Sequence, residues 1–244
     1  MNTLRWLVSS RLWVAFAAAC WSVESFVRCD AWVRWTLVAQ IFFLTWIAYL
    51  FLSDDAIRKN RVAVLLALTG ACVTFQGFQT LLWPAVCSLA VLLYRTHWMP
   101  ASWKMSTWGL RNIPLVNNVL IAGCWVAMCM LWPMQQSGAD LHVQWPFMAA
   151  AFCWVLALSL AEDLFVEIRP DASLLSLGQG KIRFLAILLV LVALAINFYY
   201  REMEASVWMS MSLSLLFLLF IRSGKRTAAK SFLLDAMIAI RFPF

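Results

Sequence analysis

Four carboxylates stand within ten residues of one another near the start of the segment AEDLFVEIRPDASLLSLGQGKIR (161–183). They are a third of the 12 acidic residues in a chain that is 64% hydrophobic. Asp163 and Glu167 are four residues apart, so a helix would place both on one face, which Pro170 then interrupts. The four acidic residues are Glu162, Asp163, Glu167 and Asp171.

A second acidic pair, Asp54 and Asp55, stands far upstream. Carboxylate oxygens are ligands for Mg²⁺, and neighbouring Arg and Lys side chains stabilise phosphate charge. Two opposed carboxylate sets with cations nearby would therefore suit a diphosphate bridged by Mg²⁺. The alternative is that these acids flank helix ends and form ion pairs, for example Glu162 or Asp163 with Arg58 or Arg169.

The composition indicates the elements that must position these residues. Only 13% of the residues are charged, against about 25% in soluble proteins, and the mean hydropathy is +0.81. Apolar runs near 20 residues recur, which is about the length that crosses a bilayer as a helix. We expect one all-α, multi-pass membrane domain over 1–244, with spans near 6–27, 32–53, 61–78, 80–95, 114–134, 145–168, 183–200 and 206–222 and a short ninth at 231–243.

The basic residues predict the orientation of these spans. If the N-terminus is cytoplasmic, all but four of the 19 Lys and Arg residues fall on the cytoplasmic side, as the positive-inside rule requires. Both acidic clusters then face that same side. The net charge of +7 is thus explained by topology and by anionic lipid headgroups, and we expect membrane lipids, not nucleic acid, as partners. The four exceptions are Arg28, Arg34, Arg201 and Arg241.

Other polar and aromatic residues have simpler explanations. The seven Cys include no CxxC pair, so we expect packing residues and not a metal or disulfide framework. Glu24 should lie near an interface or pair with Arg28. Trp and Tyr residues near the span ends predict interfacial belts: Trp32, Trp35, Trp98, Trp103, Trp108, Trp132, Trp145, Tyr199, Tyr200 and Trp208.

Several segments, in order, resemble the UbiA superfamily of intramembrane prenyltransferases. The pattern ED…E…D.SLL.LG..K.R (162–183) resembles the second aspartate motif, and WIAYLFLSDDAIRKNR (46–61) stands where the first is expected. RNIPLVNNVLIAGCW (111–125) resembles the opening of the fifth span. SRLWVAFAAACWS (10–22) and SFLLDAMIAI (231–240) resemble the first and the ninth spans, the last of which often carries an Asp.

The resemblance implies about nine helices around a cavity open to the cytoplasmic side of a bacterial inner membrane. It implies transfer of a prenyl group from a polyprenyl diphosphate to an acceptor such as a quinone precursor or tetrapyrrole pigment, with Mg²⁺. The implied metal ligands are Asp54, Asp55, Asp163 and Glu167, which with Asp171 form the catalytic set. The implied diphosphate-binding cations are Arg58, Arg111, Lys181 and Arg183.

A second hypothesis is a protein with the same fold but without catalytic activity. The first motif retains only Asp54 and Asp55, while Arg58 and Asn60 stand where further acids are expected. A degenerate protein of this kind would bind a lipid, quinone or pigment, or serve as a subunit of a membrane complex. A transporter or channel is a third, weaker hypothesis, because no inverted repeat is visible in the sequence.

Overall fold

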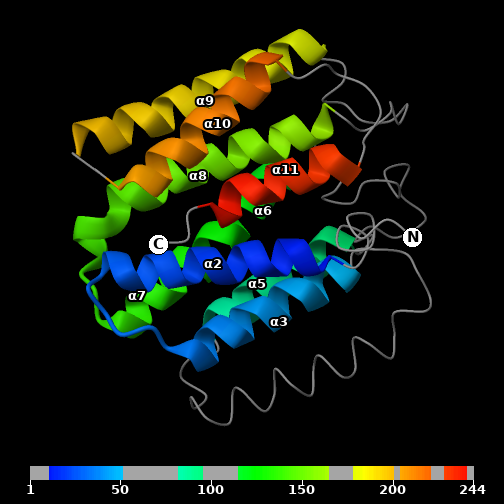
Figure 1. The fold of residues 1–244 in the computed structure, drawn as a ribbon. Helices are drawn as coiled ribbons and strands as arrows, with labels where there is room; N and C mark the ends of the chain where they lie inside the picture. The colour runs from blue at the N-terminus through cyan, green and yellow to red at the C-terminus, as the bar shows by residue number, and fades with distance from the viewer. Residues whose placement is uncertain are drawn as a thin grey trace.

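The computed structural model describes residues 11–51, 82–95, 115–164, 178–200, 204–220 and 228–240. Every regular element in these ranges is a helix (Figure 1), so the all-α prediction is confirmed for this part of the chain. The elements are α2 (Leu12–Arg28), α3 (Trp35–Phe51), α5 (Leu82–Arg95), α6 (Val116–Val126), η4 (Ala127–Leu131), α7 (Trp132–Ser137), α8 (Leu141–Asp163), α9 (Gln179–Tyr199), α10 (Ala205–Phe220) and α11 (Ala228–Ala239).

Three described helices are long and apolar enough to cross a membrane: Val116–Ser137, Leu141–Glu162 and Gln179–Tyr199. Three shorter helical stretches, Trp35–Leu50, Leu82–Val91 and Ala205–Phe220, are also apolar. These findings indicate a membrane protein. The count of nine spans stays a prediction, and the predicted span 61–78 lies outside the described residues.

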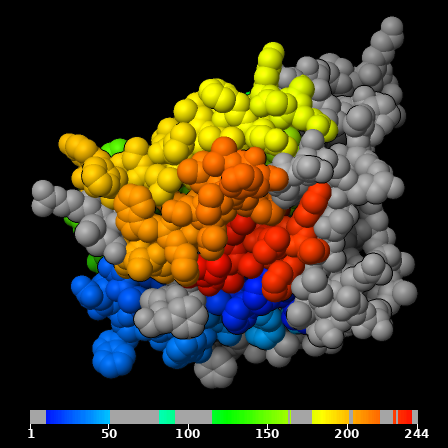
Figure 2. All heavy atoms as spheres, turned by 45° about the horizontal axis from the view of Figure 1, so that its top comes forward, coloured from blue at the N-terminus to red at the C-terminus, as the bar shows by residue number. Residues whose placement is uncertain are grey.

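The helices pack together into one core. α8 packs against α6 and α9, while α2 packs against α3 and α11. Fully buried alanines on α2 (Ala15, Ala17 and Ala18) and Ala122 on α6 let these helices approach closely. α9, α10 and α11 lie side by side on one face (Figure 2). Exposed apolar side chains on α9 and α10, such as Phe184 and Leu216, suit contact with lipid tails.

The boundaries of α8 and α9 differ from the predicted spans by several residues. α8 begins at Leu141 and not at 145, because the Asp140 side chain caps it by accepting a hydrogen bond of 2.9 Å from the His142 backbone N–H. Its last helical residue is Asp163, earlier than the predicted 168. α9 begins at Gln179, four residues before the predicted 183, directly after Gly178, whose φ of 79° suits glycine.

A π-helical turn, η4, interrupts the span formed by α6 and α7. Pro133 follows this turn and has no N–H to donate to the carbonyl four residues before it, that of Cys129. The Ser25 hydroxyl on α2 donates to that carbonyl instead, at 2.7 Å. The interhelical bond therefore satisfies a backbone group that proline leaves without its helical donor.

Burial separates the residues predicted for the aromatic belts, whose position at a membrane interface stays a prediction. Trp32, Trp35 and Trp145 are exposed at 96%, 65% and 56% and lie near helix ends at one end of the bundle. Trp132 is instead fully buried. The reason is that the α6–η4–α7 span extends to Ser137 and carries Trp132 inside the core.

Candidate functional site

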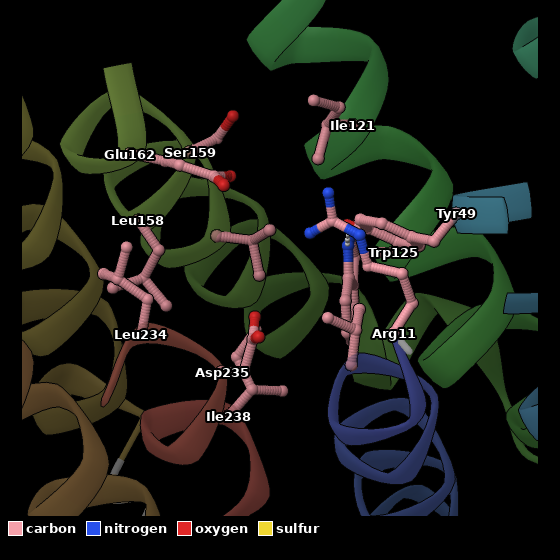
Figure 3. Close-up of a pocket in the computed structure, with 12 residues that line it drawn as sticks. Arg11, Tyr49, Ile121, Trp125, Leu158, Ser159, Glu162, Leu234, Asp235 and Ile238 are labelled. Atoms are coloured by element: carbon pink, nitrogen blue, oxygen red, sulfur yellow. Dashed lines mark hydrogen bonds between the residues drawn. The ribbon is translucent and has the colours of Figure 1, made fainter. Parts of the chain in front are cut away.

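Charged side chains from three helices line a cavity of about 50 Å³ near one end of the bundle. Arg11 precedes α2, Glu162 is near the end of α8, and Asp235 is on α11. In Figure 3 the Arg11 guanidinium and the two carboxyl groups point into the same space. We call this cavity the polar pocket. It combines one fixed positive charge with two carboxylates inside an apolar bundle.

Arg11 reaches the pocket from an unusual backbone conformation. Its φ of 61° and ψ of 10° lie in the left-handed region at the N-cap of α2, and its side chain makes no capping hydrogen bond. A residue with a Cβ in this region costs roughly 1 kcal/mol or more. In this strained backbone conformation, the Arg11 guanidinium lies in the pocket.

Tyr49 and Trp125 line the pocket near Arg11. The Trp125 indole N–H donates to the Tyr49 hydroxyl oxygen at 3.3 Å. The Tyr49 hydroxyl therefore keeps its own proton for donation to another acceptor. The charges of Arg11, Glu162 and Asp235 all act on this hydroxyl. A ligand in the pocket would meet both a cation and a neutral donor.

α11 is held against α2 by an aromatic contact close to the pocket. The Trp13 indole N–H donates to the Phe232 carbonyl oxygen at 3.2 Å. The two rings also stack with centroids 4.6 Å apart. Asp235 lies three residues after Phe232, so it shares the α2-facing side of α11. This contact fixes the position of Asp235 relative to Arg11.

The site residues predicted from the sequence are only partly described. Asp163 is the last residue of α8, next to the pocket residue Glu162. Lys181 and Arg183 are in the first turns of α9 and are not among the described lining residues of the polar pocket. The other predicted residues lie outside the described ranges: Asp54, Asp55, Arg58, Arg111, Glu167 and Asp171.

Four residues of the pocket, Arg11, Tyr49, Glu162 and Asp235, were absent from the predicted site, although Glu162 belongs to the acidic segment that suggested it. Arg11 and Asp235 are in the segments 10–22 and 231–240. These segments were compared only with the first and ninth spans of the UbiA superfamily, and no site residue was predicted in them. The signal was available, because an ionisable residue inside an apolar span is a functional-site hypothesis by default. Tyr49 had no such signal, since a Tyr near a span end is typical of an interfacial belt.

A different charged cluster occupies the opposite end of α2. Arg28 donates to Glu24 at 2.6 Å and to Glu204, just before α10, at 3.5 Å. The Arg28 guanidinium carbon lies 5.1 Å from the centre of the Phe147 ring on α8. The side chains of Glu24 and Arg28 are only 1% and 5% exposed. The predicted pairing of Glu24 with Arg28 is confirmed, and we call these three charged residues the buried triad.

The donor chemistry of the polar pocket suits a hard cation in part. Glu162 and Asp235 provide carboxylate oxygens, which Mg²⁺ prefers. No group of three His, Cys, Asp or Glu side chains able to hold a metal occurs within the described ranges. The two carboxylates would thus hold Mg²⁺ only together with ligand oxygens, water or further protein carboxylates.

Comparisons of the chain with protein-family models, with curated proteins and with solved structures found no match. The UbiA resemblance therefore rests on the sequence segments described above, and it is carried forward as a proposal.

Proposed function

We propose that this chain is a UbiA-like intramembrane protein whose polar pocket binds the diphosphate group of an isoprenoid donor for prenyl transfer. The observation that supports this most is the convergence of Arg11, Glu162 and Asp235 on one cavity. The three residues come from the first span, the end of the acidic helix and the last span. These are three of the segments on which the UbiA resemblance rests.

The proposed orientation follows from the positions of basic residues relative to the pocket. The pocket lies at the end where α2 and α9 begin and where α3 and α8 end. Arg11, Lys181 and Arg183 belong to helix starts at this end. By the positive-inside rule, this end faces the cytoplasm. We propose a multi-pass protein of the bacterial inner membrane, with the N-terminal side of α2 cytoplasmic.

Each pocket residue has a role in this proposal. Arg11 would neutralise phosphate charge, and the Tyr49 hydroxyl would donate a hydrogen bond to a phosphate oxygen. Glu162 and Asp235 would hold Mg²⁺, which would supply positive charge to stabilise the leaving diphosphate. We propose that carboxylates of the two predicted motifs complete this set: Asp54, Asp55, Asp163, Glu167 and Asp171. The predicted cations Arg58, Arg111, Lys181 and Arg183 would neutralise the remaining phosphate charge.

A second candidate function is binding without catalysis. The cavity of about 50 Å³ is several times smaller than the roughly 300–1,000 Å³ of pockets that enclose a drug-sized ligand. Such a pocket suits a polar head group better than a donor and an acceptor ring together. In this version the chain binds a lipid, quinone or pigment head, or serves as a subunit of a membrane complex.

The first test is equilibrium binding of inorganic diphosphate to the purified protein, with and without Mg²⁺. Changing Arg11 to Gln should weaken binding about tenfold or more, because a hydrogen bond to a charged group contributes roughly 1.5–3 kcal/mol. Arg34→Gln is the matched control. Arg34 is at the opposite end of the bundle, where it donates to Gln136 at 3.2 Å, and its loss should leave binding unchanged.

The second test separates the enzyme from the binding protein. Transfer of a radiolabelled prenyl group to quinone-precursor and tetrapyrrole acceptors is measured with and without Mg²⁺, beside an active prenyltransferase. Mg²⁺-dependent product that disappears in Glu162→Gln supports the enzyme. Diphosphate binding without product from any acceptor supports the non-catalytic alternative. Equal binding by the wild type and Arg11→Gln would contradict both versions of the site.

A further inference from the structure

Three tryptophans form a connected layer beneath the polar pocket. The rings of Trp21 on α2 and Trp125 on α6 are stacked, with centroids 5.9 Å apart and planes at 27°. The edge of Trp154 on α8 meets Trp21 at 6.0 Å and 75°. Trp21 and Trp154 are fully buried, and Trp125 is 8% exposed. We call these residues the tryptophan layer.

The three indoles lie at similar depth in the bundle. Trp21 is ten residues after Arg11, and Trp125 and Trp154 are nine residues from the pocket-side ends of α6 and α8. At 1.5 Å per residue, each lies roughly 14–15 Å from that end, which is about half the thickness of the hydrocarbon core. The layer therefore crosses the middle of the bundle between α2, α6 and α8.

Hydrogen bonds hold the layer at both sides. Trp125 donates to Tyr49 at 3.3 Å, on the pocket side. Trp154 donates to the Ser214 hydroxyl oxygen on α10 at 2.9 Å, and Ser214 donates to the Ser210 carbonyl oxygen at 2.7 Å. A side chain with a fixed ring plane and a fixed N–H cannot rotate away without losing these bonds. The layer is thus a rigid part of the core.

Trp125 is the residue that joins the layer to the pocket, because it also lines the cavity. Behind it, Trp21 and Trp154 fill the interior with side chains that are less than 2% exposed. The three indoles in contact with one another thus occupy the interior between α2, α6 and α8, directly behind the pocket.

We propose that the tryptophan layer is the floor of the polar pocket and that it sets which ligands fit. This inference rests on the proposed function. The pocket takes a compact anionic head group, and an attached isoprenoid tail does not enter the bundle centre beyond Trp125. Trp125 is thus the specificity-determining residue, and the tail contributes little to affinity at this site.

The experiment compares inorganic diphosphate, isopentenyl diphosphate and geranyl diphosphate as ligands of the full chain in one detergent with Mg²⁺. Burying each tail methylene would raise affinity roughly fourfold. In the wild type we expect the three affinities to agree within about tenfold. In Trp125→Ala, geranyl diphosphate should gain at least about tenfold relative to inorganic diphosphate, because the floor is opened. Comparing ratios between variants cancels partition of the tail into the micelle.

Trp132→Ala is the matched control, since Trp132 is an equally buried indole on α7 outside the layer. It should leave the ligand ratio unchanged. Partition of each ligand into protein-free micelles is measured separately, so that the corrected wild-type series tests the inference even where a Trp variant fails to fold. A steep rise of wild-type affinity with tail length would contradict the inference that the tryptophan layer keeps the tail out, but it would leave the proposed diphosphate site intact. An unchanged ratio in a folded Trp125→Ala protein overturns that inference too. No diphosphate binding by the wild type overturns the proposed function, and the inference with it.

Discussion

The two ends of α2 carry similar sets of charges in different surroundings. At each end, an arginine of the first helical segment faces two carboxylates. Arg28 faces Glu24 and Glu204. Its guanidinium donates hydrogen bonds to both carboxylates and lies over the Phe147 ring. Arg11 faces Glu162 and Asp235 across a cavity. The comparison shows that charge composition alone does not distinguish a structural cluster from a candidate binding site.

Solvation and geometry account for the difference. In the buried triad, charges that have lost water are compensated by direct contact, so removing one partner leaves a buried charge. In the polar pocket, the charged side chains line a cavity that has room for a ligand group. We therefore expect changes in the triad to affect stability and changes in the pocket to affect binding.

The largest effect on stability should come from Arg28→Met. Removing one partner of a buried ion pair costs about 3–5 kcal/mol, because Glu24 stays in the core at 1% exposure. The free energy of unfolding in detergent, followed by far-UV circular dichroism, measures this loss. The double variant Glu24→Met/Arg28→Met should recover part of it. Stability that is unchanged in Arg28→Met would show that the triad is not structural.

Ser25→Ala should have the next largest effect. It leaves the Cys129 carbonyl oxygen, which accepts the 2.7 Å bond, without its interhelical donor, at a cost of about 1–3 kcal/mol. Ser22→Ala is the control, since the Ser22 hydroxyl donates only within its own helix, to Ala19 at 2.8 Å. The same unfolding measurement compares them. Equal losses in both variants would argue against a special role for the Ser25 bond at the π turn.

Arg11→Gly should separate stability from binding. Glycine adopts the φ of 61° at this position without the penalty of a Cβ, so we expect a gain of about 0.5–1 kcal/mol in the free energy of unfolding. Diphosphate binding should be lost. Asp30→Gly, at a φ of 50° at the opposite end, should change stability in the same direction and keep binding. A loss of stability in Arg11→Gly would mean that its side chain stabilises the fold.

The smallest effect concerns the side of the membrane that each end faces. Cys29 follows α2 beside the buried triad, and burial raises the pKa of its thiol, opposed by a hydrogen bond with Ser137 and by the charge of Arg28. Its reaction with a membrane-impermeant maleimide on intact cells should therefore be slow at pH 7 and rise roughly tenfold per pH unit up to pH 9. Cys29→Ser shows the background. Labelling only after the cytoplasmic side is opened would reverse the proposed orientation.

The sequence predicted best those structural features that depend on residues close together in the chain. Apolar runs predicted helices at eight places that the structure describes, because helix formation in an apolar chain is decided locally. The pairing of Glu24 with Arg28 was also predictable, since the two are one helical turn apart. The start of α8 was misplaced, because the Asp140 cap was not considered.

The candidate site was predicted less well. Of the acidic segment, the described part brings Glu162 to the pocket, but its partners Arg11 and Asp235 are more than 70 residues away from it in the chain. Lys181 and Arg183 are closer in sequence to Glu162 yet lie on another helix, outside the described pocket lining. Sequence proximity is a poor guide when a site is formed by the ends of several helices.

The amino-acid sequence by itself determined that this protein is helical and suited to a membrane, because both follow from apolar run lengths and backbone hydrogen bonding. It also determined the local Glu24–Arg28 pair. Only the tertiary structure decided that Arg11, Glu162 and Asp235 share one cavity and that Trp21, Trp125 and Trp154 meet beneath it. Those contacts depend on how distant helices pack, and helix packing is set by side-chain shape across the whole core.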